Sequence, residues 1–530
     1  MATKTPTVPG VFTRASSGLV RSVSTLDAVY YGVMAITVAY MVFIVAAIPN
    51  YVGASIEWST VITMVGAIAL GLVYALFAAV YPRSGGEYVF LSRTVHPLVG
   101  FVISFEQTFW YAFYFGVNGA FFSIYGLAPL FTALGLQTKS QGLQSLGTFF
   151  TQPLGIFLGG TVMVFLIGGL VWRGMRGYFR FQRWGGTIAL GSVLLTILVF
   201  ALGAAGVLHF QQAFDGLAGN GAYNTVIAGA QKAGQELSWS TQLGPTLNFM
   251  IWPAFALLFS VNMVSFSGEI KNVRRGQLIG ILGAMIVSAL LMIGLTYFGR
   301  HAVGTQFLVA ASSTPADKFP LPVAPYLNNF AAILSNNPLM TVLMSFWVVL
   351  VIPYALGSNV IYGSRALFAW GLDGVAPSKV GSVSDRFHSP AAAILVMVVA
   401  AEIALVIFAF TAWVAILSGL LGFVIAFFVV SLTGLVFPFR NREVFENSPA
   451  AIRVAGVPLL TIASVVAIPF LAFLIWRTFV DQTYGASTTI SIVVNIVVFL
   501  VGIAWFLGAR AYRKQRGVDV DRQFKEIPVE

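Results

Sequence analysis

The sequence predicts an all-α membrane protein whose twelve helices each cross the bilayer. The chain has 530 residues, of which 58% are hydrophobic and only 9% are charged, whereas a soluble domain carries about 25% charged residues. Apolar runs of about 20 residues recur along almost its whole length, and each is long enough to cross a hydrocarbon core of about 30 Å as a helix. A membrane β-barrel would show alternating segments of about ten residues instead. Composition and run length therefore predict a polytopic helical bundle.

Short polar connections separate the apolar runs and set the predicted span boundaries. In chain order the spans are expected near 27–48, 58–81, 97–126, 153–173, 184–207, 247–267, 276–298, 340–371, 391–411, 412–438, 453–476 and 488–509. The longest connections follow the fifth and seventh spans. Within the second of them, residues 322–336 are expected to form a short helix over the outer end of the bundle.

Basic residues predict the orientation, because Lys and Arg accumulate in cytoplasmic loops. With the N-terminus inside, all but five of the 29 Lys and Arg residues fall on the cytoplasmic side of the cell membrane. The exceptions are Lys139, Lys232, Arg300, Lys318 and Arg477. Residues 1–26 and 510–530 are then cytoplasmic tails, and 208–246 is an extracellular loop. The net charge of +11 follows from this topology, and its dispersal over many loops gives no reason to expect nucleic-acid binding.

Several enzyme classes lack their sequence signatures in this chain. None of the eight lysines follows a glycine, so the phosphate-binding loop of nucleotide hydrolases is absent. The histidines, His96, His209, His301 and His388, are too scattered for a helical metal pair, and there is no cysteine to add a ligand or form a disulfide. No G-x-S-x-G nucleophile motif is found. We therefore expect a protein that is not an enzyme and that has no bound cofactor.

A polar segment, YPRSGGEYVFLSR at residues 81–93, lies between the second and third spans. It combines one acid and two arginines with the pair Gly85-Gly86. Because lipid offers no partners for charges or free backbone groups, the segment must lie at an aqueous face or line a cavity. We expect it to form a tight polar turn between two spans.

Two further polar segments lie, like residues 81–93, at the predicted cytoplasmic ends of spans. The sixth span ends in GEIKNVRR at 268–275, and the eighth is followed by SRALFAWGLDGVAP at 364–377. Together with residues 81–93, these segments resemble three inner-loop motifs of the amino acid–polyamine–organocation superfamily of secondary transporters. They occur in the order and at the spacing found in that superfamily. The resemblance covers roughly the first ten of the twelve spans.

The resemblance implies a LeuT-like fold, a five-plus-five inverted repeat of helices with two additional helices. Residues 27–207 would form the first repeat and residues 247–438 the second, with 453–509 as the eleventh and twelfth spans. In such folds the substrate lies at the membrane midplane, where the first and sixth helices are interrupted and offer free backbone groups.

The first span carries the first part of the implied substrate site. A rise of 1.5 Å per residue from Asp27 places Val38 about 16 Å into the membrane. Aligned on the superfamily, Val38, Ala39 and Tyr40 occupy the place of a Gly-Ser-Gly stretch whose amides receive a substrate carboxylate, and Thr37 adds a side-chain hydroxyl next to them. No glycine is present here. This difference favours, as the alternative, a solute other than an ordinary amino acid.

The sixth span carries the second part, and its interruption is expected near Phe259, Ser260 and Asn262. Ser260 and Asn262 place polar groups about 10 Å from the inner end of this span. Asn262 either binds substrate or ties two helices together, since interhelical amide bonds are common in membranes.

Glu106 is an acid about 15 Å deep in the third span. An ionisable group at that depth is costly and indicates function by default. Because residues four apart share a helix face, Trp110 and Tyr114 lie on its side of the helix, and Tyr111 is adjacent. A carboxylate beside aromatic rings suits an ammonium group. The alternative is a protonated Glu106 that is hydrogen-bonded between helices, and for Glu402 of the ninth span we favour that structural role.

The coupling ion is left open by the sequence. Ser358 and Asn359 of the eighth span are candidate ligands of a sodium site completed by first-span carbonyls, although both also suit helix–helix contacts. Glu106 is the candidate for proton coupling. We thus expect a secondary transporter that moves an amino acid, amine or related organic cation by alternating access. The alternatives are a carrier of a different small solute and a transporter-like amino-acid sensor without turnover.

Overall fold

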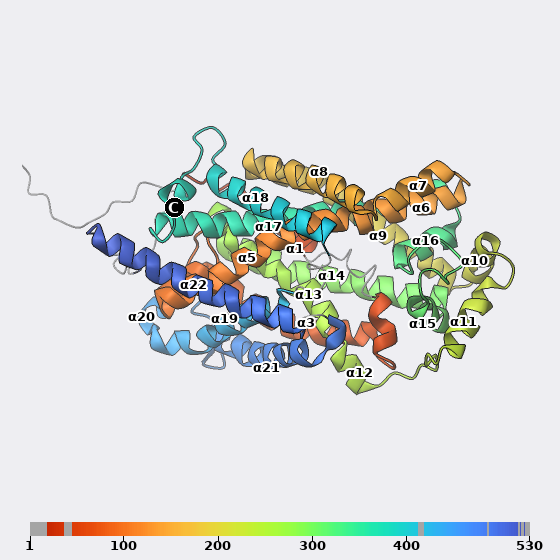
Figure 1. The fold of residues 1–530 in the computed structure, drawn as a ribbon. Coiled ribbons are helices and arrows are strands. Elements are labelled where there is room, and N and C mark those ends of the chain that lie inside the picture. Colours follow the sequence, from red (N-terminus) through yellow and green to blue (C-terminus); the bar gives the residue numbers. More distant parts are fainter. Residues whose placement is uncertain are drawn as a thin grey trace, which may run out of the picture.

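Long helices dominate the computed structural model, which describes residues 18–35, 45–411, 418–484, 487–517, 520 and 524. They lie side by side in an elongated bundle (Figure 1). The short helices α10, α11, α15 and α16 gather at one end of the bundle, and α20 and the C-terminal end of α22 lie at the other. We call the latter the basic end, because it holds Arg93, Arg365 and Arg440.

Eleven helices in the described part of the chain are long and apolar enough to cross a membrane. They are α3 (Ile56–Val80), α5 (Pro97–Phe121) with η3 (Phe122–Leu127) and α6 (Ala128–Gln137), α8 (Pro153–Trp172), α9 (Met175–Ala204), α12 (Leu243–Asn248) with α13 (Ile251–Leu257) and η4 (Leu258–Ser265), α14 (Val273–Val303), α17 (Pro338–Leu372), α18 (Ala391–Phe410), α19 (Leu420–Arg440), α21 (Leu459–Val480) and α22 (Thr489–Gln515). This confirms the prediction of a polytopic helical membrane protein.

The first predicted span is described only at its two ends. Residues Thr25–Ala35 form α1 and residues Val45–Asn50 form the 3-10 helix η2. Residues 36–44 lie outside the described part of the chain, and so do 412–417 at the start of the tenth predicted span. The count of twelve spans therefore stays a prediction.

The remaining elements are short and lie in the connections. They are α4 (Glu87–Thr94), α7 (Gln141–Phe149), α10 (Phe210–Ala218), α11 (Ala222–Lys232), η5 (Ser267–Glu269), α15 (Thr305–Ser313), α16 (Leu327–Ser335), η6 (Ser378–Gly381), α20 (Arg442–Glu446), a hairpin of β1 (Arg453–Val454) and β2 (Val457–Pro458), and η8 (Gln482–Tyr484). The short helix predicted within 322–336 is confirmed as α16.

Two predicted boundaries are wrong for identifiable reasons. Helix α9 begins nine residues before the predicted start at 184, because its basic residues extend the helix and stay exposed rather than forming a loop. Helix α21 begins six residues after the predicted start at 453. Gly456 adopts φ +83°, which turns the chain back as the β1–β2 hairpin, and Pro458 then caps the helix.

Apolar side chains face outward along several of the long helices. Val162 and Phe165 of α8, Leu290 of α14 and Leu500 of α22 are each at least 58% exposed. A soluble protein rarely exposes so much apolar surface. In a lipid bilayer this surface contacts acyl chains, which agrees with a bundle that spans the membrane.

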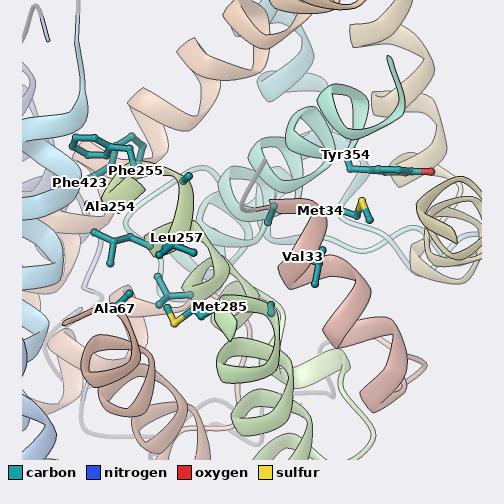
Figure 2. Close-up of a cluster of buried hydrophobic side chains, with 14 of the residues drawn as sticks. Val33, Met34, Ala67, Ala254, Phe255, Leu257, Met285, Tyr354 and Phe423 are labelled. Atoms are coloured by element: carbon teal, nitrogen blue, oxygen red, sulfur yellow. The ribbon is translucent and has the colours of Figure 1, made fainter. Parts of the chain in front are cut away.

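Inside the bundle, apolar packing surrounds α1 and α13. Figure 2 shows side chains of these two helices grouped with partners from α3, α14, α17 and α19; those labelled are Val33, Met34, Ala67, Ala254, Phe255, Leu257, Met285, Tyr354 and Phe423. Glycine permits the closest approaches: an added Cβ at Gly32 of α1 would lie 2.5 Å from the Ala284 Cβ of α14.

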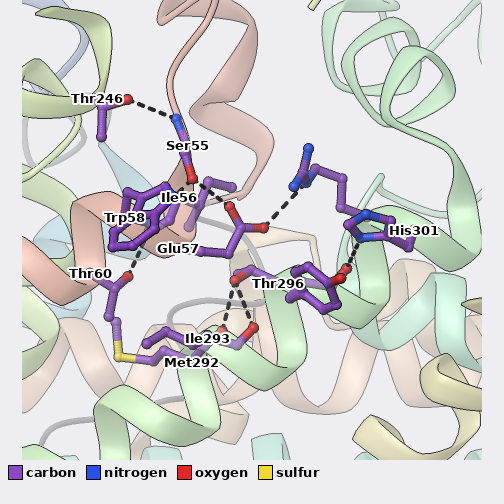
Figure 3. A network of polar contacts seen from close by, with 12 residues as sticks. Ser55, Ile56, Glu57, Trp58, Thr60, Thr246, Met292, Ile293, Thr296 and His301 are labelled. Carbon is purple, nitrogen blue, oxygen red and sulfur yellow. Dashed lines mark hydrogen bonds and ion pairs between the residues drawn. The ribbon is translucent and has the colours of Figure 1, made fainter. Parts of the chain in front are cut away.

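At the end opposite the basic end, polar contacts tie α3 to α12 and α14 (Figure 3). Ser55 caps α3 by accepting a 3.2 Å hydrogen bond from the Trp58 amide, and its own amide donates to the Thr246 hydroxyl at 3.0 Å. Glu57 accepts from the Ser55 hydroxyl at 2.7 Å and pairs with Arg300 at 3.2 Å.

At the basic end, the segment 81–93 is more than the tight turn that we expected. Residues from Glu87 onward form α4, and nearly all of its side chains are buried against α5, α17 and α19. Gly85 and Gly86 adopt φ +113° and +53°, a conformation that favours glycine. A Cβ at Gly85 would lie 2.8 Å from the Ala369 Cβ. The two glycines therefore let this loop enter the bundle rather than remain in water.

A buried ion pair joins η5 to α17 near this loop. The Arg365 guanidinium donates to both Glu269 carboxylate oxygens, at 2.9 and 3.4 Å, and both side chains are almost fully buried. The Glu269 carbonyl also accepts the amides of Ser22 and Val23, which lie just before α1. Arg365 thereby anchors the start of the first span through Glu269.

We predict that Gly116→Ala destabilises the protein by about 1–3 kcal/mol, the usual cost of overpacking. The added Cβ would lie 2.1 Å from the Ala401 carbonyl oxygen, so α5 and α18 must separate. Thermal unfolding in detergent measures the loss. Gly191→Ala is the matched control, because no atom lies within 4 Å of a Cβ built there. Equal unfolding temperatures for the two variants would contradict the prediction.

We also predict that Arg365→Ala destabilises the protein by about 3–5 kcal/mol, because it leaves the Glu269 carboxylate buried without a cation. Thermal unfolding tests this. The double variant Arg365→Met, Glu269→Met should regain most of the loss. Arg442→Ala, which removes the exposed pair with Glu446, should cost little. If Arg365→Ala lowers the stability of the protein no more than Arg442→Ala does, the buried pair of Arg365 and Glu269 does not have the stabilising role described here.

Candidate functional site

The sixth predicted span changes its helix type partway along its length. The α-helix α13 ends at Leu257, and Leu258–Ser265 continue as the 3-10 helix η4. The predicted interruption near Phe259–Asn262 falls within η4, where the structure shows a change from α-helix to 3-10 helix. Ser260 and Asn262 are buried there, and the Ser260 hydroxyl has no hydrogen-bond partner in the described part of the chain. The change in helix type thus brings polar groups into an apolar interior.

Asn262 is the centre of a buried polar network that joins four elements. Its side-chain amide donates to the Ser358 hydroxyl oxygen of α17 at 2.9 Å, and that oxygen also accepts from the Tyr31 hydroxyl of α1 at 3.1 Å. The Tyr111 hydroxyl of α5 donates to the side-chain oxygen, Oδ1, of Asn262. The sequence predicted Asn262, Tyr111 and Ser358 as site residues, and the structure brings them together. It adds Tyr31, whose position in an apolar run gave no signal.

Aromatic rings enclose one side of this network. The Tyr111 ring lies 4.0 Å from the Tyr362 ring and 4.8 Å from the Phe423 ring, measured between centroids. Phe259 and Phe423 meet edge to face at 5.2 Å. The polar groups of Asn262 and Tyr111 therefore lie beside π faces, an arrangement that can bind a cationic group.

The polar network continues to Glu87, a residue for which the sequence predicted no site role. The Tyr362 hydroxyl donates to one carboxyl oxygen of Glu87, whose side chain is about 1% exposed. Burial raises the pKa of the Glu87 carboxyl, while Tyr362, Tyr74 and Gln107 favour its charged form. Its position at the start of α4, directly after the Gly85-Gly86 turn, was the available signal.

Glu106 faces a different neighbour. A Cβ built on Gly422 of α19 would lie 1.5 Å from a Glu106 carboxyl oxygen, so the carboxyl packs directly against the backbone of α19. Trp110 packs on Gly419 in the same way, and the Gly419 amide donates to the Tyr114 hydroxyl at 3.1 Å. The predicted shared face of Glu106, Trp110 and Tyr114 is confirmed, but it contacts α19, whereas Tyr111 joins the central network.

Neither carboxyl oxygen of Glu106 has a hydrogen-bond partner among the described residues. The carboxyl is fully buried, so a charged form would be strongly disfavoured there. Glu402 is less buried and accepts a 2.9 Å hydrogen bond from Thr161 of α8, which agrees with the helix–helix role that we favoured for it.

The structure describes only some of the other predicted site residues. Thr37, Val38, Ala39 and Tyr40 lie outside the described residues. Asn359 is buried beside Ser358 on α17, and its side-chain nitrogen has no hydrogen-bond partner in the described portion of the chain. That Ser358 and Asn359 bind a coupling ion stays a prediction.

Comparison with known proteins identifies the family. No curated protein matches the chain. A sequence model described as "Amino acid permease" matches residues 24–505. The match includes every described element of the Asn262 network and the Glu87 segment. It also agrees with the resemblance in the three inner loops, since this family is part of the same superfamily. The chain therefore belongs to the amino acid permease family.

Proposed function

We propose that this protein is a secondary transporter that moves an amino acid, amine or related organic cation across the cytoplasmic membrane by alternating access. Family membership supports transport of a small molecule through a membrane. The observation that carries the proposal is the Asn262 network, which gathers polar groups where the sixth span leaves α-helical geometry.

The chemistry of the network suits a small polar solute. The Asn262 amide both donates and accepts hydrogen bonds, and the hydroxyls of Tyr111, Ser358 and Tyr31 can do the same. These groups now bond to one another. A solute that enters would form hydrogen bonds to these groups in place of the bonds that they make to one another. No buried polar group would then be left without a partner. The adjacent ring of Phe259 adds a surface for an ammonium group.

The residues Thr37, Val38, Ala39 and Tyr40 would complete the site from the first span, with Ser260 opposite them. The support for this part is the sequence alone. The missing glycines in the first span favour, as the alternative, a solute that lacks a carboxylate. Glu106 and Trp110 face α19 rather than Asn262, so we assign them a position beside the central site.

The proposal includes the fold that the superfamily implies: twelve spans, with inverted repeats at 27–207 and 247–438 and both termini in the cytoplasm. An interrupted first span would fit the two described ends, α1 and η2, which differ in helix type. The basic end of the bundle would face the cytoplasm. Sodium or protons would drive transport, with Ser358 and Asn359 as sodium ligands or a buried carboxyl as the proton carrier.

We predict that the purified protein accelerates counterflow of a solute that also stabilises it. A thermal-shift screen of amino acids, amines and carboxylates identifies stabilising compounds, because a ligand that binds the folded state raises the unfolding temperature. Proteoliposomes loaded with the best compound should then exchange it for its labelled form, faster than protein-free liposomes do. An amino-acid sensor would show the thermal shift without the exchange, and that result would refute the proposed transport.

We further predict that Asn262→Ala weakens substrate binding by about 5- to 100-fold. The change leaves Tyr111 and Ser358 without their shared partner, at a cost of about 1–3 kcal/mol. Thermal-shift titration with the compound selected by the screen gives the affinity. Asn495→Ala is the matched control, since Asn495 is also a buried asparagine, and within the described residues it donates to the backbone carbonyls of Ser418 and Ser491 instead of joining the network. If both variants bind like the wild type, the network is not the binding site.

A further inference from the structure

Three polar groups without hydrogen-bond partners gather around the buried Glu87 carboxyl. One Glu87 oxygen, the Tyr74 hydroxyl and both polar atoms of the Gln107 amide make no hydrogen bond in the part of the chain that the structure describes. All three side chains are buried. Tyr74 and Gln107 nevertheless interact with the Glu87 carboxyl. Since buried polar groups are normally satisfied, such a cluster needs an explanation.

A purely structural acid in this protein has a different environment. Glu269, which lies nearby at the same end of the bundle, accepts two hydrogen bonds from Arg365. No salt bridge joins Glu87 to a cation among the described residues. Within the described residues, the hydrogen bond to its carboxyl comes from Tyr362. A buried carboxyl without a cation is favoured in its neutral form, because desolvation penalises the charge.

The groups that face Glu87 can stabilise two protonation states. Tyr74 of α3, Gln107 and Tyr111 of α5, and Tyr362 of α17 surround it. A neutral carboxyl donates its own proton and keeps a carbonyl oxygen as acceptor, so it needs fewer hydrogen-bond donors around it than a carboxylate does. With a carboxylate, the Tyr74 hydroxyl and the Gln107 amide become hydrogen-bond donors to it, which lowers the cost of the charge. The orphaned donors are thus the groups that an ionised Glu87 requires.

The arginines of α4 and α17 are already paired, and the acid of α5, Glu106, packs against Gly422 of α19. Arg365, one turn beyond Tyr362 on α17, is paired with Glu269, and Arg93 of α4 itself is paired with Asp373 at 2.7 Å. The only ionisable residue of α19 is Arg440, its last residue, and η4 has none. Protonation of Glu87 therefore changes the charge of this region without a fixed counter-ion.

Two connections link Glu87 to the central network. Through side chains, Tyr362 bonds to Glu87 and stacks near Tyr111, which bonds to Asn262. Through the backbone, the Gly85 amide donates to the Ser265 carbonyl at the end of η4, at 2.8 Å. This backbone bond joins η4 directly to the loop that holds Glu87.

We propose that Glu87 is the proton-binding group of this protein and that it couples proton movement to solute transport. The inference rests on the proposed transport function. In the arrangement described here the carboxyl holds its proton. When the central network opens toward the basic end, the proton passes from the carboxyl oxygen to water, and the carboxylate accepts hydrogen bonds from Tyr74 and Gln107. A proton taken up again from the other side of the membrane returns the carboxyl to its neutral form.

The test compares Glu87→Gln with the wild type in proteoliposomes. The probes are a radiolabelled mixture of the common amino acids and, separately, radiolabelled putrescine. Counterflow at equal pH on both sides measures exchange, and accumulation under an imposed pH gradient measures coupling. We expect Glu87→Gln to keep exchange within about twofold of wild type and to lose gradient-driven accumulation. Glu402→Gln is the matched control, because it removes another acid of the bundle that lies outside the network.

Three results would overturn the proposal while leaving transport intact: gradient-driven accumulation that survives in Glu87→Gln, its loss in Glu106→Gln alone, or wild-type accumulation driven by sodium and not by protons. A wild type that exchanges neither probe, nor the compound selected by the screen, would instead refute the proposed function, and the coupling role would fall with it.

A second measurement covers the case in which Glu87→Gln fails to fold. The folded wild type holds a proton on Glu87 that the unfolded chain releases, because the folded pKa is raised. Its stability should therefore fall as the pH rises above the usual carboxyl pKa. Tyr362→Phe keeps the ring and removes the hydrogen bond to the carboxyl, so it should make the charged form less favourable and extend this fall to higher pH. A pH profile identical to wild type would contradict the assignment.

Discussion

Asn262 lies where the sixth span stops being an α-helix, and its side chain bonds to groups from two other helices. Within a membrane no water competes for these groups, so each must find its partner inside the protein. The hydrogen bonds of Asn262, Ser358 and Tyr111 consequently fix the relative positions of η4, α17 and α5. The remaining polar features of the interior are arranged around this constraint.

The loop 84–86 shows how the chain accommodates a polar segment beside that network. Two consecutive glycines with positive φ let the backbone pass close to Ala369 and donate to the Ser265 carbonyl. Helix α4 can then enter the bundle with Glu87 pointing toward Tyr362. A residue with a side chain at Gly85 would push this loop away from α17, and the link between η4 and α4 would be lost.

The buried acids of this protein occupy three kinds of environment. Glu269 is paired with a cation, Glu106 packs against the Gly422 backbone and makes no hydrogen bond among the described residues, and Glu87 is surrounded by donors that it only partly uses. Burial does not distinguish them, because all three side chains are almost completely buried. The neighbouring groups decide whether a carboxyl is held charged, held neutral, or able to change between the two.

The sequence by itself determined the membrane class, the approximate spans and the family, because hydrophobic run length and loop motifs are local properties of the chain. It also predicted an interruption where the sixth span changes from α-helix to 3-10 helix, and it selected Asn262, Tyr111 and Ser358. Only the tertiary structure separated Glu106 from that group and joined Glu87 and Tyr31 to it. Side chains far apart in the chain, such as Glu87 and Tyr362, meet through helix packing and the Gly85-Gly86 turn. Periodicity along one helix shows which side of that helix a residue occupies. Which other helix contacts that side depends on how the helices pack together.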